Sequence, residues 1–258
     1  MCGIAGGFWK SQQVSHAEVI NAALALLKHR GPDDSGVFSQ SMPGGKLYLG
    51  QTRLSIIDLS ERGHQPMFLE DGSLGIVYNG EIYNYRELRQ ELIADGWTFR
   101  SETDTEVLLK CWSAWGAACL KRLEGMFAFA VFDRRSNSLT CVRDAFGIKP
   151  FFYSVNGGDF TFASEIGALL AMKTSRPAPD LERAYAYLVH ADYDSSDRTF
   201  IKEIKHLRPG QMVQIDLTKG QVADPQTWWR PDPANVDEIS FADATEALRE
   251  RFLDSVRI

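Results

Sequence analysis

Tight turns between short β-prone runs constrain the fold of this chain more than any other feature. The β-prone runs are residues 2–8, 47–58, 74–78, 126–132, 139–143, 151–155 and 160–163. Turns at residues 134–138 and 156–159 each join two of these runs, and turns this short connect antiparallel neighbours. The sequence therefore predicts antiparallel sheet.

Helix patterns are grouped along the chain instead of alternating with the strands. A capping residue followed three positions later by an acidic residue predicts helix starts at Ser15, Asn84, Thr103 and Ser240. A weaker helical pattern begins at Asp180. This order excludes a Rossmann-like βαβ series and favours an α+β fold, with two sheets and helices packed outside them.

Composition and charge exclude several classes of protein. The 258 residues carry a formal net charge of −6, which argues against a nucleic-acid partner or an anionic membrane surface. The longest apolar stretch, residues 126–132, is too short to span a membrane, and no secretory signal is visible. The 4 cysteines form no CxxC pair or disulfide framework, so we expect a cytoplasmic protein.

Cys2 is a candidate nucleophile. A free thiol with a pKa of about 8.5 is only a few per cent ionised at neutral pH, so it needs a nearby base. If Met1 is removed, the α-amine of Cys2, with a pKa of about 7.7–8.0, can serve as that base. The alternative interpretation is a small residue on a strand.

Asn79 and Gly80 are candidate oxyanion-hole residues, because they offer a side-chain amide and an unobstructed backbone N–H. The alternative is an ordinary Asn-Gly turn. Arg53 could hold a carboxylate, or it could be an edge-strand arginine in solvent. Asp104 could bind an ammonium group or simply favour the helix dipole. No histidine has metal-ligand spacing, so we predict no metal site.

Together these motifs resemble, in order, the class II glutamine amidotransferases, and more narrowly the glutamine-hydrolysing asparagine synthetase branch. The motifs are Cys2-Gly3-Ile4, His29-Arg30-Gly31-Pro32-Asp33, Arg53-Leu54-Ser55-Ile56, Asn79–Asn84, Thr103-Asp104, residues 123–129, Arg143-Asp144, Gly147–Pro150, residues 162–166 and Pro209-Gly210. The sequence departs from the pattern at Gln51, Thr52 and Ala145, none of which touches the proposed chemistry.

The resemblance implies an N-terminal-nucleophile hydrolase fold, a four-layer αββα sandwich. It implies that Cys2 attacks the side-chain amide of L-glutamine while its α-amine moves the proton, and that Asn79 and Gly80 stabilise the oxyanion. Arg53 would bind the substrate carboxylate, with Asp104 and Glu81 near its α-amino group. No cofactor is expected for glutamine hydrolysis.

The resemblance also implies a division of labour between domains. We predict an amidotransferase domain at residues 2–217, a connector at 218–239, and at 240–258 the first helix of a C-terminal synthetase domain that uses ATP and magnesium. The pyrophosphate-binding SGGxDS signature of that domain is absent from these residues.

Three alternatives remain open at this point. The acceptor of the ammonia could be a carboxylate other than aspartate, in a cell-surface sugar or natural-product pathway. The chain could be a non-catalytic interaction module, although its intact candidate residues oppose that. A homodimer is also left open.

Overall fold

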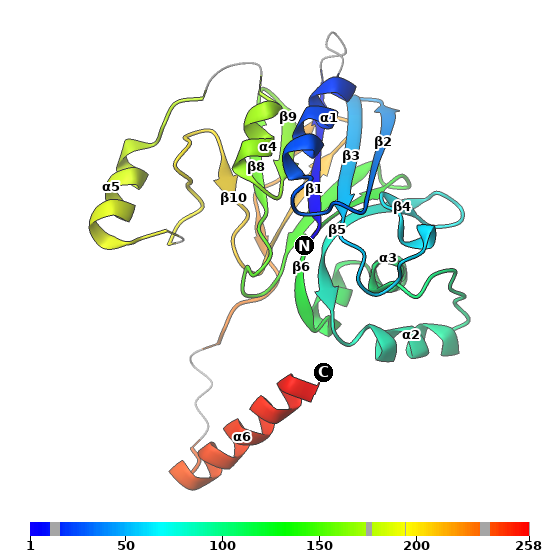
Figure 1. Cartoon of the computed structure of the whole chain (residues 1–258), viewed down its shortest axis with the longest axis vertical. Helices are drawn as coiled ribbons and strands as arrows, with labels where there is room; N and C mark the ends of the chain where they lie inside the picture. The colour runs from blue at the N-terminus through cyan, green and yellow to red at the C-terminus, as the bar shows by residue number, and fades with distance from the viewer. Residues whose placement is uncertain (11–15, 174–176, 194, 233–237, 258) are drawn as a thin grey trace.

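A computed structural model describes residues 1–10, 16–173, 177–193, 195–232 and 238–257. Its core is two antiparallel sheets (Figure 1). Sheet A has six strands in the order β10-β8-β9-β1-β3-β2. These are β1 (Gly3–Trp9), β2 (Asp34–Met42), β3 (Gly45–Arg53), β8 (Phe152–Asn156), β9 (Asp159–Ala163) and β10 (Lys205–His206).

Sheet B has seven strands, six of them in the order β12-β11-β7-β6-β5-β4, and β13 also pairs with β11. They are β4 (Met67–Phe68), β5 (Leu74–Ile82), β6 (Gly125–Asp133), β7 (Ser138–Arg143), β11 (Gln211–Asp216), β12 (Gln221–Val222) and β13 (Gln226–Thr227). The two predicted hairpins are confirmed, as β6 pairs with β7 and β8 with β9, both antiparallel.

Helices cover the outer face of each sheet. The helices are α1 (His16–Leu27), α2 (Tyr85–Ala94), α3 (Asp104–Trp115), α4 (Ile166–Ala171), α5 (Leu181–His190) and α6 (Phe241–Arg257), with 3-10 turns η1 (Glu61–Gly63) and η2 (Gly116–Arg122). Apolar side chains of α1 and α4 pack on sheet A, and those of α2 and α3 pack on sheet B. A third apolar cluster fills the space between the sheets. The predicted four-layer αββα sandwich is confirmed.

Strand β1 is buried on both faces at the centre of sheet A. Ile4 and Phe8 pack into the cluster between the sheets, while Ala5 and Trp9 pack toward α1 and α4. Its neighbours are β9 on one side and β3 on the other. The position before this strand, Cys2, is therefore placed by the most enclosed strand of the sheet.

Two predicted segments have different bounds in the structure. The run predicted at 47–58 ends as a strand at Arg53, and residues 54–60 leave the sheet. The run predicted at 74–78 continues as β5 to Ile82. Asn79 and Gly80 therefore lie in a strand, and the alternative prediction of an Asn-Gly turn is wrong. Their pairing with Ala128 and Phe127 on β6 holds them extended.

Helix caps follow the sequence in part. The Thr103 hydroxyl accepts a hydrogen bond from Glu106 N at 3.1 Å, as predicted for α3. Asn84 does precede α2 but makes no side-chain cap. Its amide instead donates to Arg122 O at 2.9 Å and accepts from Glu124 N at 3.0 Å, which ties α2 to the start of β6.

Several sequence predictions fall on residues outside the described ranges. Ser15, predicted to cap α1, is one of them, as are residues 233–237 of the predicted connector and Ile258. Within the described part of the connector, β12 and β13 extend sheet B.

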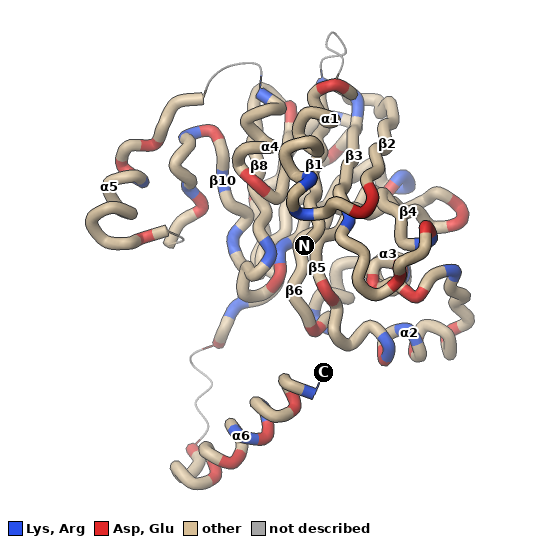
Figure 2. The backbone as a smooth tube through the Cα atoms, in the orientation of Figure 1, with Lys and Arg blue, Asp and Glu red and all other residues tan. Residues whose placement is uncertain are grey.

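Helix α6 lies apart from the sandwich in Figure 1, and all of its described side chains are exposed or half-buried. Acidic and basic residues are mixed along it, as Figure 2 shows. None of the helices in the described ranges combines the length and apolar character that crossing a membrane requires.

Asp144, in the loop after β7, organises the chain next to the sheets. Its buried carboxylate accepts hydrogen bonds from the backbone N–H groups of Phe127, Phe146, Ile148 and Lys149, at 2.9–3.2 Å. A carboxylate that accepts several backbone N–H groups contributes more than a neutral acceptor. Asp144 therefore fixes the loop 145–149 against β6.

We predict that Asp144→Ala lowers the free energy of unfolding by at least about 3 kcal/mol, since it leaves buried N–H groups without an acceptor. The measurement is urea denaturation followed by circular dichroism. Asp216→Ala is the matched control, because Asp216 accepts from Thr218 N and Lys219 N in an exposed turn. The control should lose less than about 1 kcal/mol. Equal losses in the two variants would contradict the assigned role of Asp144.

Candidate active site

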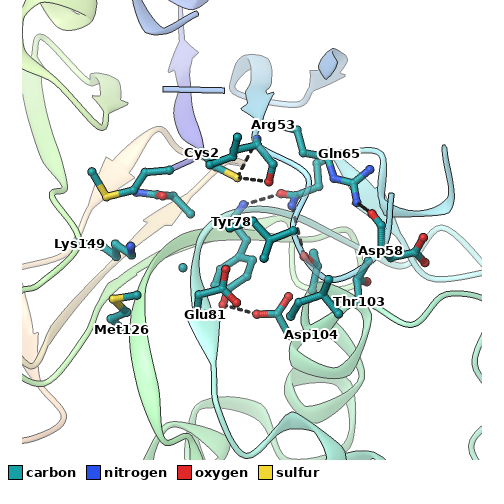
Figure 3. Close-up of a pocket in the computed structure, with 17 residues that line it drawn as sticks. Cys2, Arg53, Asp58, Gln65, Tyr78, Glu81, Thr103, Asp104, Met126 and Lys149 are labelled. Atoms are coloured by element: carbon teal, nitrogen blue, oxygen red, sulfur yellow. Dashed lines mark hydrogen bonds between the residues drawn. The ribbon is translucent and has the colours of Figure 1, made fainter. Parts of the chain in front are cut away.

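A cavity of about 260 Å³ opens at the start of β1, between the ends of the two sheets. Every site residue predicted from the sequence lines it: Cys2, Arg53, Asn79, Gly80, Glu81 and Asp104. Figure 3 shows the labelled side chains around one space, with Cys2 on one side and Glu81 and Asp104 on the other. Residues far apart in the sequence thus meet in one pocket, which we call the Cys2 pocket.

The Cys2 thiol lies at the pocket wall beside Leu54, which follows β3. Its Sγ is 3.4 Å from Leu54 N, which donates to it, and 3.7 Å from Leu54 O. Burial raises the pKa of the Cys2 thiol, and the negative charge of Asp104 adds to that rise, whereas the Leu54 contact, the positive N-terminal amine and the charge of Arg53 act the other way. The pocket alone therefore does not favour a thiolate.

Arg30, in the motif His29–Asp33, holds the backbone of Cys2. The sequence did not predict this role for Arg30. Arg30 Nε donates to Cys2 O at 2.9 Å, and Arg30 Nη1 forms an ion pair with Glu165 at 2.9 Å. His29 Nε2 lies 3.0 Å from the same Glu165 oxygen. The motif follows the end of α1 at Leu27, and through Arg30 it connects Glu165 to the carbonyl of Cys2.

The same motif packs closely on β3. A Cβ added to Gly31 would lie 2.3 Å from Thr52 O, so a side chain there would displace β3. Asp33 Oδ2 accepts from Ser55 N at 2.8 Å and fixes the chain just past Arg53. These contacts set the position of Leu54 beside the thiol.

Asn79 carries an unpaired amide deep in the pocket. Its side chain is 1% exposed, and neither its Nδ2 nor its Oδ1 has a hydrogen-bond partner among the described residues. Burying an amide without a partner is costly, so such a group is suited to a ligand. Gly80, next along β5, has no room for a side chain, because a Cβ would lie 2.4 Å from Met126 O.

The alternative prediction for Arg53, a solvent-exposed arginine on an edge strand, is wrong. Strand β3 lies between β1 and β2, and Arg53 is buried. Its guanidinium donates to Ser60 O at 2.9 Å and to Asp58 O, which fastens the loop after β3. It lines the Cys2 pocket. Its part in binding a carboxylate stays a prediction.

Asp104 and Glu81 form the acidic side of the pocket. Asp104, the first residue of α3, accepts from Tyr78 Oη at 2.7 Å and from Ile82 N at 3.0 Å. Burial raises the pKa of its carboxyl, and those two hydrogen bonds oppose the rise. Burial, followed by the charge of Asp104, raises the pKa of Glu81 to about 7, while Lys149 acts to lower it.

Several pocket residues were not predicted as site residues, among them Gln65, Tyr78 and Lys149. Gln65 accepts from Tyr78 N at 2.7 Å and donates to Thr105 Oγ1 at 3.3 Å, so it joins β5 to α3. Tyr78 adjoins Asn79 in the sequence, and Lys149 lies in the motif Gly147–Pro150. Their positions in or next to these motifs could have indicated that Tyr78 and Lys149 belong to the site, whereas Gln65 lies in none of the motifs.

Several known proteins are similar to this chain in sequence. The chain is 38% identical over 223 residues to asparagine synthetase (glutamine-hydrolyzing) 3 of Bacillus subtilis, covering 85% of this chain and 33% of that protein. It is 33% identical over 245 residues to amidase chry2 of Gibberella zeae, covering 93% of this chain and 35% of that protein. The chain spans less than half of the length of these relatives.

A solved structure, glutamine phosphoribosylpyrophosphate amidotransferase from B. subtilis, is similar in fold. The TM-score is 0.64 at 19% sequence identity, over 89% of this chain and 50% of that one. The family model described as the glutamine amidotransferase domain matches residues 1–229, which include every residue of the Cys2 pocket. The chain therefore belongs to the glutamine amidotransferase domain family.

Proposed function

We propose that Cys2 hydrolyses L-glutamine to glutamate and ammonia. The observation that carries the proposal is the thiol at the end of β1 facing a pocket that also holds the unpaired Asn79 amide. After removal of Met1, the α-amine takes the thiol proton and the sulfur attacks the amide carbon of glutamine. Asn79 and Gly80 receive the oxyanion, the C–N bond breaks as the leaving nitrogen takes the proton from the α-ammonium group of Cys2 and departs as ammonia, and water cleaves the thioester to glutamate and the free Cys2 thiol.

The other pocket residues are proposed to hold the amino-acid end of the substrate. Arg53 supplies a cation for the α-carboxylate. Asp104 and Glu81 supply acceptors for the α-ammonium group, which supports an α-amino acid as the ligand. No cofactor takes part in this half-reaction as proposed.

We further propose that the ammonia serves a glutamine-hydrolysing asparagine synthetase. In that protein a C-terminal synthetase domain, using ATP and magnesium, would convert aspartate to asparagine. Similarity to the B. subtilis asparagine synthetase supports this assignment. A reducing cytoplasm suits the free Cys2 thiol, and we place the protein there.

A second candidate keeps the glutaminase and changes the acceptor. The similarity to an amidase of Gibberella zeae, over 93% of this chain, favours this alternative. The two candidate acceptors can be distinguished by the sequence of the acceptor domain and by assays that compare aspartate with other carboxylates. A non-catalytic interaction module is disfavoured, because Cys2 and the other candidate residues are all present around one pocket.

We predict that Cys2→Ala lowers the rate of glutamate formation from glutamine by at least about 10³-fold, because the attacking sulfur is lost. Protein that keeps Met1 should show the same loss, since its Cys2 nitrogen is then an amide. A coupled glutamate assay measures the rate, and intact-protein mass spectrometry identifies the N-terminus. Cys119→Ala, a buried thiol outside the pocket, should stay within about twofold of the parent. Glutamate formation by Cys2→Ala at the parent rate refutes the mechanism.

We also predict a pH dependence of glutamine binding that depends on Glu81. Its carboxyl has a pKa raised to about 7, so it is ionised above that pH and neutral below it. In the Cys2→Ala protein, the dissociation constant of glutamine should therefore be about tenfold larger at pH 6 than at pH 8. Isothermal titration calorimetry measures it. Glu81→Gln in the same background should bind more weakly at pH 8 and lose this pH dependence. Identical pH profiles for the two proteins would exclude Glu81 from ammonium binding.

A further inference from the structure

Lys149 is a pocket cation to which the proposed reaction gives no part. It is 5% exposed and lines the Cys2 pocket together with Cys2, Glu81 and Met126. Within the described ranges of the chain, its Nζ has no hydrogen bond or ion pair. Figure 3 shows its side chain beside Met126 at the left of the pocket. A buried ammonium group without a fixed partner is costly, so its retention calls for a counter-charge.

The loop before Lys149 fixes its backbone from both sides. Lys149 N donates to Asp144 Oδ2 at 2.9 Å, and Lys149 O accepts from Arg143 Nε at 2.8 Å. Arg143 also donates to Gly147 O at 2.7 Å. Hydrogen bonds from Arg143 and to Asp144 thus fix the backbone of Lys149 at the pocket wall.

Glu81 is the carboxylate in this pocket whose ionised form is favoured by the charge of Lys149. Its half-buried carboxylate has no hydrogen bond or ion pair within the described residues, whereas Asp104 Oδ2 accepts hydrogen bonds from Tyr78 and Ile82. Burial and the charge of Asp104 disfavour the ionised form of Glu81, and Lys149 favours it. Conversely, Glu81 is the main group that favours the charged form of Lys149.

Arg53 is not among the groups that act on Glu81, and its proposed partner is the α-carboxylate of the substrate. The charged or titratable groups that act on Glu81 are Asp104 on α3, Lys149 on its loop, the N-terminal amine before β1 and Tyr78 on β5. Among them, Lys149 is the side-chain cation.

We propose that Lys149 is a positioning residue, whose ammonium group holds the Glu81 carboxylate in the pocket as an anion that receives the α-ammonium group of glutamine. Lys149 acts through Glu81 and takes no part in breaking the amide bond. This inference rests on the proposed function, in which the Cys2 pocket binds glutamine.

The test measures glutamine binding by calorimetry between pH 6 and pH 8.5, in the whole chain carrying Cys2→Ala. Lys149→Met should raise the dissociation constant about fivefold or more at pH 7 and move the midpoint of the pH dependence upward, because Glu81 then ionises at higher pH. Lys149→Arg should restore both quantities. Lys121→Met, the same change on an exposed side chain, should alter neither.

A double variant separates action through Glu81 from direct contact with the substrate. In a Glu81→Gln background, Lys149→Met should cause no further loss of affinity, because the group through which it acts is gone. Equal losses in both backgrounds, or an unmoved pH midpoint, overturn the proposal. If Lys149→Met does not fold, as judged by circular dichroism, Lys149→Gln takes its place.

The parent protein distinguishes this proposal from the proposed function. If the Cys2→Ala parent binds no glutamine and the native chain forms no glutamate, the proposed function and this inference both fail. If the parent binds glutamine and Lys149→Met binds it equally well, only the role of Lys149 is overturned.

Discussion

The hydrogen bond from Arg30 to the carbonyl of Cys2 is the contact on which the site depends. The first residues of a chain are usually poorly ordered unless something ties them down. Here β1 is paired on both sides and buried on both faces, and Arg30, neutralised by Glu165, fixes the residue just before it. Cys2, the proposed nucleophile, is thereby positioned by a central strand although it lies near the start of the sequence.

Three carboxylates, those of Asp58, Glu81 and Asp104, line the Cys2 pocket together with two side-chain cations, Arg53 and Lys149, and charges this close together interact strongly. Each charge is assigned by its hydrogen bonds. Asp104 is fixed by Tyr78 and Ile82, and Arg53 by loop carbonyls. Glu81 and Lys149 have no such fixed partners among the described residues, and with a pKa raised to about 7 the Glu81 carboxyl changes its charge near neutral pH.

Local sequence predicted the hairpins and the start of α3, because turn residues and the Thr103 cap act over a few positions. It failed where tertiary contacts override local preference. Asn79 and Gly80 read as a turn but form part of β5, since pairing with β6 and the close approach of Met126 O require an extended glycine. Asn84 has a capping pattern, yet its amide is used to join α2 to the start of β6.

The site residues could be named from sequence because the motifs occur in a recognisable order, but their environments could not. Nothing in the run around Cys2 indicates that burial raises the pKa of its thiol. That rise has a chemical consequence. A pocket that disfavours the thiolate makes a proton acceptor within reach of the sulfur more important. The α-amine released by removal of Met1 meets this need, because its pKa lies near neutrality. If Cys2 is the nucleophile, removal of Met1 places a free amine on the same residue as the thiol, where it can act as the base.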